Sequence, residues 1–252
     1  IEKSLQPVDI SVVINAAAYT DVDSAEQESG SAFAVNRDGP SYLAARCEQI
    51  KVPLIHISTD YVFDGRKKGA YLESDPVSPL GVYGRSKAEG ESLIIDCLRE
   101  HVIIRTSWLY GSHGSNFVKK MLTLGRDEEI IRVVADQHGC PTYAADLAEV
   151  ILLIAAKIEN DGPIDWWGTY HYCGEGQTTW HAFAEAIFEI AKKYDSFAVK
   201  EVLPVSTAEY PTPAPRPANS VLDCSKIGKT FGIQPRPWRE SLVEMIEKLL
   251  VK

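Results

Sequence analysis

The sequence predicts an α/β fold built on a parallel sheet, and two patterns and the bulk composition support this expectation. Short apolar runs alternate with longer segments of helical character, and the clearest runs are Ile10 to Asn15, Leu54 to Ile57 and Val102 to Thr106. Small or polar residues follow each run, as is typical of strands that end at a ligand-binding edge. The 252 residues, 45% of them hydrophobic, are enough for one large domain or two lobes.

Charge, cysteine usage and hydropathy exclude several functional classes. The formal net charge of -9 argues against a polyanion as the main partner, so we expect no nucleic-acid binding. The longest apolar run, Val150 to Ala156, is too short to span a bilayer, and no signal peptide opens the sequence, so the cytoplasm is the expected location. Five dispersed cysteines without a CxxC motif favour reduced thiols over disulfides or zinc; they are Cys47, Cys97, Cys140, Cys173 and Cys224.

The first part of the chain predicts one strand and one long helix. Ile1 to Gln6 is typical of the end of a helix, and Pro7 separates it from the strand Ile10 to Asn15. The small residues after that strand would let a flat ligand approach the backbone, although packing under a helix is an equally good interpretation. From Glu26 to Gln49 the apolar spacing predicts a helix on the sheet, with Asn36 at its middle.

The chemistry is expected between the strand Leu54 to Ile57 and the helix that begins near Gly81. Among eleven tyrosines, Tyr83 alone has a lysine, Lys87, four residues later. On a helix these two side chains share one face. A cation beside a phenol lowers the phenol pKa and makes it a better proton donor. Thr59, at the end of the strand, would bind the same oxygen, so the three residues together indicate carbonyl reduction. A surface Tyr and Lys on an amphipathic helix is the alternative.

The rest of the chain continues the alternation of strands and helices. Val102 to Thr106 predicts a buried strand, with Trp108 just beyond its carboxyl end. Five prolines among the residues from Pro204 to Pro217 predict an extended segment. His181 has no partner at metal-ligand spacing and is expected to be a surface or capping residue, so no metal site is expected. The further helices are expected at Asn116 to Leu124, Asp146 to Ile158, Trp180 to Tyr194 and Trp238 to Val251, and further strands at Ile130 to Val134 and Tyr170 to Cys173.

Five sequence blocks identify a resemblance. STDYVFDG, SPLGVYGRSKAEGE, RTSWLYG, DQHGCPT and RPANSVLD occur in this order and together resemble the dTDP-4-dehydrorhamnose reductases, which are extended short-chain dehydrogenase/reductases. The resemblance runs from about Val12 to the C-terminus. It implies a Rossmann-like doubly wound parallel sheet formed by residues 1–110 plus 144–174. It also implies a smaller C-terminal α/β substrate lobe formed by residues 111–143 plus 175–252.

The resemblance also implies an activity and roles for single residues. The enzyme would reduce the C4 ketone of dTDP-4-dehydro-6-deoxy-L-mannose to dTDP-L-rhamnose with NADPH or NADH. Tyr83 would give the proton, Lys87 would lower the Tyr83 pKa and hold the nicotinamide ribose, and Thr59 would bind the reacting oxygen. The backbone from Ala17 through Ala18 and Tyr19 to Thr20 would lie along the cofactor, and Asn36 would order the active-site helix. The substrate-binding residues would be Thr59, Asp60, Trp108, Asn116, Gln137, Arg216 and Asn219.

Two features depart from this pattern or stay open. The first glycine is Gly30, so the glycine-rich phosphate loop and the first strands of the family pattern are absent from this sequence. With the strand order 3-2-1-4-5-6, Ile10 to Asn15 would then have no neighbour and Leu54 to Ile57 would be an exposed edge. We therefore expect the natural protein to carry about 40 further residues upstream, roughly one βαβ unit. Mg²⁺ use and the choice between monomer and homodimer vary within the family, and no motif decides them.

Two rival functions follow from the same scaffold. A nucleotide-sugar dehydratase or 4-epimerase is the enzyme rival, but dehydration requires a second carboxyl in a Thr-Asp-Glu motif, and Tyr61 stands at that place. A non-catalytic subunit similar to the regulatory subunit of methionine adenosyltransferase is the rival from another class. The absent phosphate loop keeps it open, whereas intact Thr59, Tyr83 and Lys87 argue against it.

Overall fold

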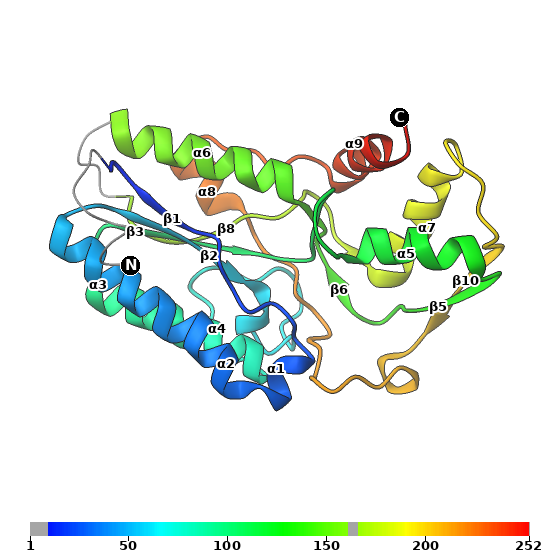
Figure 1. The fold of residues 1–252 in the computed structure, drawn as a ribbon, viewed down its shortest axis with the longest axis horizontal. Helices are drawn as coiled ribbons and strands as arrows, with labels where there is room; N and C mark the ends of the chain where they lie inside the picture. The colour runs from blue at the N-terminus through cyan, green and yellow to red at the C-terminus, as the bar shows by residue number, and fades with distance from the viewer. Residues whose placement is uncertain (1–9, 161–165, 252) are drawn as a thin grey trace.

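The computed structural model describes residues 10–160 and 166–251, so the helix end expected at Ile1 to Gln6 lies outside the described residues. Figure 1 shows a sheet with its helices at one end of the long axis and a second group of helices and strands at the other. In chain order the elements are β1 (Val13–Asn15), α1 (Ser24–Gln27), α2 (Ser29–Phe33), the π-helical turn η1 (Ala34–Asp38), α3 (Gly39–Ile50), β2 (Leu54–Thr59), the 3₁₀ turn η2 (Asp60–Val62), α4 (Val82–Cys97), β3 (His101–Thr106), β4 (Leu109–Tyr110), α5 (Phe117–Asp127), β5 (Ile130–Val134), β6 (His138–Gly139), β7 (Thr142–Tyr143), α6 (Ala144–Asn160), β8 (Gly168–His171), β9 (Thr178–Thr179), α7 (Trp180–Ala191), β10 (Glu201–Val205), the 3₁₀ turn η3 (Thr207–Glu209), α8 (Ser225–Phe231) and α9 (Trp238–Leu250).

The main sheet confirms the predicted α/β class. Among the described residues it has four parallel strands in the order β1-β2-β3-β8. The register pairs Asn15 with His56 and Thr59 with Thr106, so the carboxyl ends of β1, β2 and β3 lie at one edge. This is the edge at which open α/β sheets bind ligands.

Helices cover both faces of this sheet because neighbouring strand residues point to opposite sides. Leu54 and Ile103 pack against α3 and α4 on one face. Ile55, Val102 and Ile104 pack on the other face, against α6 and α8. Figure 1 shows these two helix layers below and above the strands. Helix α8 was not expected, and it lies on the sheet although it follows residue 175 in the chain.

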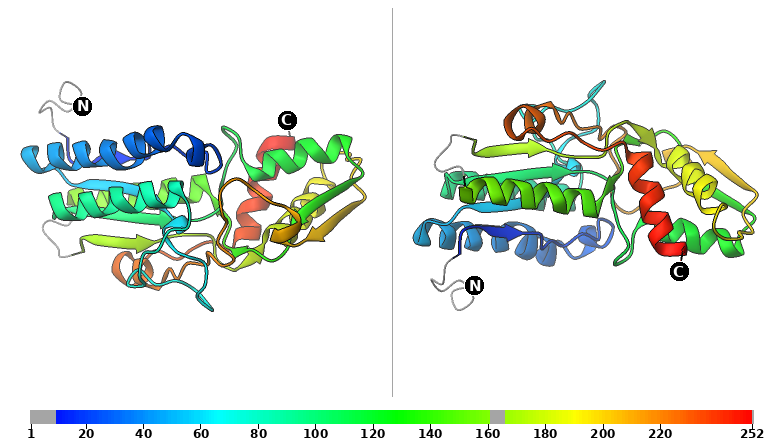
Figure 2. Two further views of the ribbon diagram at one scale, coloured as in Figure 1. Left: turned by 90° about the horizontal axis from the view of Figure 1, so that it is seen from below. Right: turned by 90° about the horizontal axis from the view of Figure 1, so that it is seen from above.

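A second hydrophobic cluster forms the other end of the molecule. Helices α5, α7 and α9 pack together with the two-stranded parallel pair β5 and β10. Its buried side chains include Phe183, Ile187 and Leu242, each with no exposed surface. Figure 2 shows this group beside the sheet in two further views, with the chain crossing between the two parts several times.

The expected place of the first strand was wrong. We expected the strand near Ile10 to Asn15 to lack a neighbour, but β1 pairs directly with β2, and Val13 lies opposite Leu54. Two strands that follow one another through a helical connection are usually neighbours in the sheet. As a result β1, rather than the Leu54 strand, is the outer strand of the described sheet.

The long helix expected from Glu26 to Gln49 is largely confirmed, because α2, η1 and α3 follow one another without a break from Ser29 to Ile50. It differs in two details: α1 is a separate turn before it, and its middle part, η1, is π-helical. The π-helical turn brings the Asn36 carbonyl against α4, where an added Cβ on Gly90 would lie 2.1 Å from its oxygen. The segment Pro204 to Pro217 also differs, because it begins inside β10 and contains the turn η3. The strand expected at Tyr170 to Cys173 is β8, which begins at Gly168 and ends at His171.

Candidate active site

Helix α4 delivers Tyr83 and Lys87 to the carboxyl end of β2. Its first turns lie so close to η2 that an added Cβ on Gly84 would be 2.2 Å from the carbonyl oxygen of Tyr61. Only glycine permits this approach. The ring of Tyr83 meets the ring of Tyr61 edge to face, with 5.6 Å between ring centres. Tyr83 is therefore placed at the end of β2 next to η2, and Lys87 follows it one turn later on α4.

The Tyr83 phenol is held in its protonated form. Burial raises the pKa of Tyr83 to about 12, and the charge of Asp60 adds to the rise. The Thr59 hydroxyl acts in the opposite direction, since its hydrogen bond to Tyr83 lowers the pKa. The expectation that Lys87 lowers the Tyr83 pKa is wrong for this state of the protein. The Lys87 nitrogen forms its hydrogen bonds elsewhere, with Ile57 and His56.

Lys87 is buried, with 1% of its surface exposed. Its Nζ donates a hydrogen bond to the backbone oxygen of Ile57 over 2.7 Å and lies 3.2 Å from His56 Nε2. Burial lowers the pKa of Lys87 to about 8, against the opposing charge of Glu91. An amine with this pKa exchanges a proton near neutral pH, as general acid-base chemistry requires.

Asn36 fixes the loop after β1 relative to the active-site helix. Its Oδ1 accepts from the Tyr19 backbone nitrogen over 2.8 Å, and its Nδ2 donates to the Tyr19 oxygen and to Ser86 Oγ, both over 3.0 Å. The Ser86 hydroxyl in turn donates to the Tyr83 carbonyl over 2.8 Å. Asn36 is thus a buried amide that bonds both to backbone and to a side chain of α4.

The expected cofactor-contacting segment is open to solvent. Ala17 and Thr20 are exposed, and Ala18 and Tyr19 are half-buried. The segment follows the carboxyl end of β1, where Asn15 Oδ1 accepts from the Ala17 backbone nitrogen over 3.1 Å. None of the four residues is buried.

Asp60 is the most unusual carboxyl of the site. It is 2% exposed, and the Thr59 hydroxyl donates to its Oδ1 over 3.0 Å. Its Oδ2 has no hydrogen-bond partner among the residues that the structure describes. Burial raises the pKa of Asp60 to about 6, partly offset by the hydroxyl of Ser220. A buried carboxyl with an unpartnered oxygen at a strand end is typical of a functional site.

We expect Asp60→Asn to raise the stability of the protein more at neutral pH than at acid pH. The folded pKa of about 6 lies above the 3.8 of a free aspartate side chain, so between these pH values the folded state binds more protons than the unfolded state. Wild-type stability therefore falls as pH rises through this range. Removal of the charge should therefore stabilise by about 2 kcal/mol more at pH 7 than at pH 4.5. Urea unfolding of Asp60→Asn and of the exposed control Asp127→Asn at both pH values measures this difference. An equal change at both pH values would show that the charge of Asp60 does not destabilise the folded state.

Trp108 adopts a strained backbone at the end of β3. Its φ of 47° lies in the left-handed region, which bulky residues rarely adopt without a functional reason. Its ring stacks on Trp180, with 3.6 Å between ring centres and an angle of 8°. The ring also covers Gly139, where an added Cβ would lie 2.3 Å from it. Trp180 was missed because the sequence alone presents it as the first residue of a helix.

Gln137 and Arg216 come together in a cavity of about 460 Å³ between the two ends of the molecule. Lys120, Arg132 and Trp180 line the same cavity, and the first two were not expected from the sequence. Arg216 forms an ion pair with Asp23, with 2.8 Å between Nη2 and Oδ2. Three cationic side chains beside aromatic rings fit an anionic ligand with a planar base.

Asn116 and Asn219 are not part of this cavity. Asn116 caps α5, since its Oδ1 accepts from the Lys119 nitrogen and its Nδ2 donates to the Gly111 oxygen. Asn219 Nδ2 donates to the backbone oxygens of Lys67 and Gly69, and its Oδ1 accepts from the Val221 nitrogen. Both side chains are therefore used to hold backbone in this structure.

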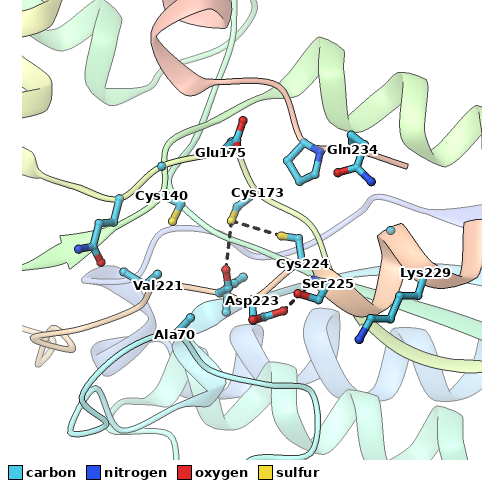
Figure 3. Close-up of a pocket in the computed structure, with 16 residues that line it drawn as sticks. Ala70, Cys140, Cys173, Glu175, Val221, Asp223, Cys224, Ser225, Lys229 and Gln234 are labelled. Carbon is cyan, nitrogen blue, oxygen red and sulfur yellow. Dashed lines mark hydrogen bonds between the residues drawn. The ribbon is translucent and has the colours of Figure 1, made fainter. Parts of the chain in front are cut away.

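A cavity of about 640 Å³ lies elsewhere. Figure 3 shows Cys140, Cys173 and Cys224 among its lining residues, with Asp223 close to Cys224. The sulfur atoms of Cys173 and Cys224 are 3.6 Å apart. None of the proposed catalytic groups lines this cavity, so volume alone does not locate the chemistry.

Within residues 10–160 and 166–251 the structure has neither a metal-binding cluster nor a membrane-spanning helix. No group of three or more His, Cys, Asp or Glu residues in the described ranges could hold a metal ion. No helix within those ranges is both long and apolar enough to cross a bilayer. His181, expected on the surface or in a cap, is half-buried, and its Nε2 lies 2.9 Å from the Val202 oxygen.

Comparison with known proteins agrees with this geometry. The family model described as the RmlD substrate binding domain matches residues 1–251. A dTDP-4-dehydrorhamnose reductase of Sinorhizobium fredii is 44% identical over 252 residues, which are 100% of this chain and 85% of the relative.

Two solved structures give the same result. A dTDP-4-dehydrorhamnose reductase from Clostridium acetobutylicum has a TM-score of 0.87 and 40% identity, and the match covers 95% of this chain and 81% of the other. A second one, from Bacillus anthracis in complex with NADP, has a TM-score of 0.84 and 38% identity, with 94% of this chain and 80% of the other covered.

Proposed function

This chain belongs to the dTDP-4-dehydrorhamnose reductase family and is an NAD(P)-dependent reductase of dTDP-rhamnose biosynthesis, and we propose that Tyr83, Lys87 and Thr59 carry the reduction. The substrate is dTDP-4-dehydro-6-deoxy-L-mannose, whose C4 ketone is reduced, and the product is dTDP-L-rhamnose. One observation carries the proposal most. The Thr59 hydroxyl acts on the Tyr83 phenol and lowers its pKa, and the buried Lys87 follows one turn later on the same helix, α4.

The described residues fit the nicotinamide end of a dinucleotide cofactor. Ser58 Oγ and Thr106 Oγ1 are buried at the ends of β2 and β3 and have no hydrogen-bond partner among the described residues. The open segment from Ala17 to Thr20 lies at the end of β1. When bound, the cofactor supplies a hydride to the ketone carbon. We propose NADPH or NADH in this role; the relative from Bacillus anthracis holds NADP. We assign no step to Mg²⁺.

The protein's own groups manage the proton and the developing charge. Reduction of the ketone places negative charge on its oxygen, and Tyr83 donates its hydroxyl hydrogen to that oxygen. A phenol whose pKa burial raises to about 12 stays protonated at neutral pH, so it is ready to donate. Thr59 holds the same oxygen from a second side, which stabilises the charge in the transition state. Lys87 then returns a proton to the Tyr83 phenolate.

The substrate would lie between the two lobes. We propose that residues 1–110 plus 144–174 bind the cofactor and that residues 111–143 plus 175–252 hold the substrate. Arg216, Lys120 and Arg132 would contact the diphosphate, because guanidinium and ammonium groups bind phosphate oxygens. Asp60 and the Trp108 ring would position the sugar. For this to happen Arg216 must exchange its ion pair with Asp23 for the substrate.

Family membership also supports proposals on assembly and location. We propose a monomer or a homodimer in the cytoplasm. Light scattering of the purified protein distinguishes the monomer from the homodimer. We also propose that Asn116 and Asn219 act by shaping the substrate lobe, since their amides hold backbone groups. A dehydratase reaction is disfavoured because Tyr61 stands where that chemistry needs a carboxyl.

Turnover with a defined substrate tests the function. We expect the protein to oxidise NADPH only in the presence of dTDP-4-dehydro-6-deoxy-L-mannose, and we expect dTDP-L-rhamnose as the product. Loss of absorbance from the reduced nicotinamide measures the rate, and chromatography identifies the product. A folded protein without turnover that co-purifies with a synthetase would instead indicate the non-catalytic subunit.

A further inference from the structure

Behind Lys87 lies a short chain of buried polar groups that the reaction described above does not use. The Asn15 amide contacts His56, and His56 contacts Lys87. His56 has no exposed surface and Asn15 is 6% exposed. His56 belongs to β2 and Asn15 to β1, and the two lie opposite each other in the sheet register.

The backbone fixes which end of the Asn15 amide faces His56. The Ala17 backbone N–H lies 3.1 Å from Asn15 Oδ1, and a backbone nitrogen can only donate. The oxygen of the amide must therefore face Ala17. The Nδ2 group, which can only donate, is left facing His56 Nδ1 over 3.0 Å.

The direction of this bond determines the tautomer of His56. A ring nitrogen that accepts a hydrogen bond carries no hydrogen, so Nδ1 is bare. Burial keeps the pKa of His56 well below its usual value, so the ring is neutral and its single hydrogen must be on Nε2. This hydrogen points toward Lys87 Nζ, which is 3.2 Å away. Two donors facing each other would repel, whereas an unprotonated amine would accept the bond.

We propose that Asn15 and His56 are positioning residues that favour the unprotonated form of the Lys87 amine in the cofactor-free protein. Asn15 sets the Nε2–H tautomer of His56, and His56 donates that hydrogen to Lys87 Nζ. Lys87 meanwhile donates one of its own hydrogens to the Ile57 oxygen over 2.7 Å.

The same contact assists the reaction, in a way that rests on the role proposed for Lys87. When an ammonium at Lys87 gives a proton to the Tyr83 phenolate, an O–H bond forms, an N–H bond breaks, and a neutral amine remains. The His56 hydrogen stabilises this amine in a place that water does not reach. His56 thus favours proton transfer from Lys87 to Tyr83 over its reverse.

The charged groups around Lys87 act against this effect and must be counted. Glu91, one turn along α4, favours the ammonium form, but its carboxylate is paired with Arg105 of β3 over 2.6 Å. Tyr83 is neutral because burial raises its pKa. His56, neutral on β2, is the group that contacts Lys87 Nζ directly. The pair of Asn15 and His56 therefore decides the state of Lys87 together with burial.

The tautomer can be measured without any turnover. We expect ¹⁵N–¹H spectra of the protein with labelled histidine, recorded above the Lys87 pKa, to show His56 with hydrogen on Nε2 and none on Nδ1. The signals that disappear in His56→Gln identify this ring. Hydrogen on Nδ1, or a doubly protonated ring, would overturn the inference.

An isosteric substitution of Asn15 tests the consequence. In Asn15→Asp a carboxylate oxygen still accepts from Ala17, but the other oxygen now requires a hydrogen on His56 Nδ1. Nε2 is then bare, accepts from the Lys87 ammonium, and raises the Lys87 pKa. We expect the His56 tautomer to switch and the alkaline limb of the pH–rate profile to move up by about one unit. Asn160→Asp on the exposed end of α6, which adds the same charge, should change neither.

Two results would contradict this account. An unchanged tautomer in Asn15→Asp would show that Asn15 does not set it, and an unchanged alkaline limb would show that His56 does not act on Lys87. Lack of turnover in the wild type combined with the Nε2–H tautomer would count against the proposed function alone, because the spectra of the cofactor-free protein support the inference independently.

Discussion

Tyr83→Phe is expected to lower kcat by about 10²- to 10⁴-fold, the range that general acid catalysis usually contributes. The substitution removes the hydroxyl that protonates the ketone oxygen and leaves the ring in its edge-to-face contact with Tyr61. Since the ring keeps its packing against Tyr61, we expect little change in the free energy of unfolding. Steady-state rates with saturating cofactor and keto-sugar, beside a urea unfolding curve, measure both effects.

A matched control separates the chemistry from general effects of losing a phenol. Tyr42→Phe removes the same group from a side chain that is 65% exposed on α3, and it should leave kcat and KM unchanged. A Tyr83→Phe enzyme with the wild-type rate would exclude Tyr83 as the proton donor. The Thr59 hydroxyl and the Asp60 carboxyl would then be the groups to examine.

Glu91→Gln is expected to produce the largest loss of stability, about 3–5 kcal/mol. Glu91 on α4 binds Arg105 of β3 through two guanidinium nitrogens, at 3.0 Å from Nε and 2.6 Å from Nη2. The exposed fractions of the two side chains are 3% and 5%. The amide would leave the Arg105 charge buried and unpaired, which costs more than the pair itself contributes. Urea unfolding of the purified variant measures the change.

The neighbouring surface pair provides the control. Glu89 lies two residues away, on the solvent side of α4, and pairs with Arg37 over 3.4 Å. Glu89→Gln should change the free energy of unfolding by less than about 1 kcal/mol, because exposed pairs are screened by water. Equal effects of the two substitutions would mean that the Arg105 charge finds another partner after Glu91 is neutralised.

Short-range patterns in the sequence were sufficient for most of the sheet and for the catalytic group. The apolar runs at Leu54 and Val102 predicted β2 and β3 because buried parallel strands are continuous stretches of branched residues. The four-residue spacing of Tyr83 and Lys87 placed them on one helix face, since helical geometry is local. These features depend on residues close together in the chain, and the sequence shows them directly.

The remaining features depend on contacts between distant segments. The pairing of β1 with β2, the turn η1 inside the expected helix, and the short strands β4, β6, β7 and β9 are fixed by partners far away in the chain. For the same reason the sequence did not reveal the stacking of Trp108 on Trp180. A strand or an aromatic pair of this kind has no periodicity of its own to detect.

The states of the ionisable groups were likewise decided by the tertiary structure. The sequence identified Lys87 as the partner of Tyr83 but gave the wrong sign for the Tyr83 pKa, because proximity along a helix suggests a charge effect and burial opposes it. Only the folded chain places Lys87 against Ile57 and His56, and only there does Asp60 lose its solvent. The sequence alone thus determined which residues meet at the strand ends. The fold determined how they hold their protons, because desolvation depends on everything packed around a group.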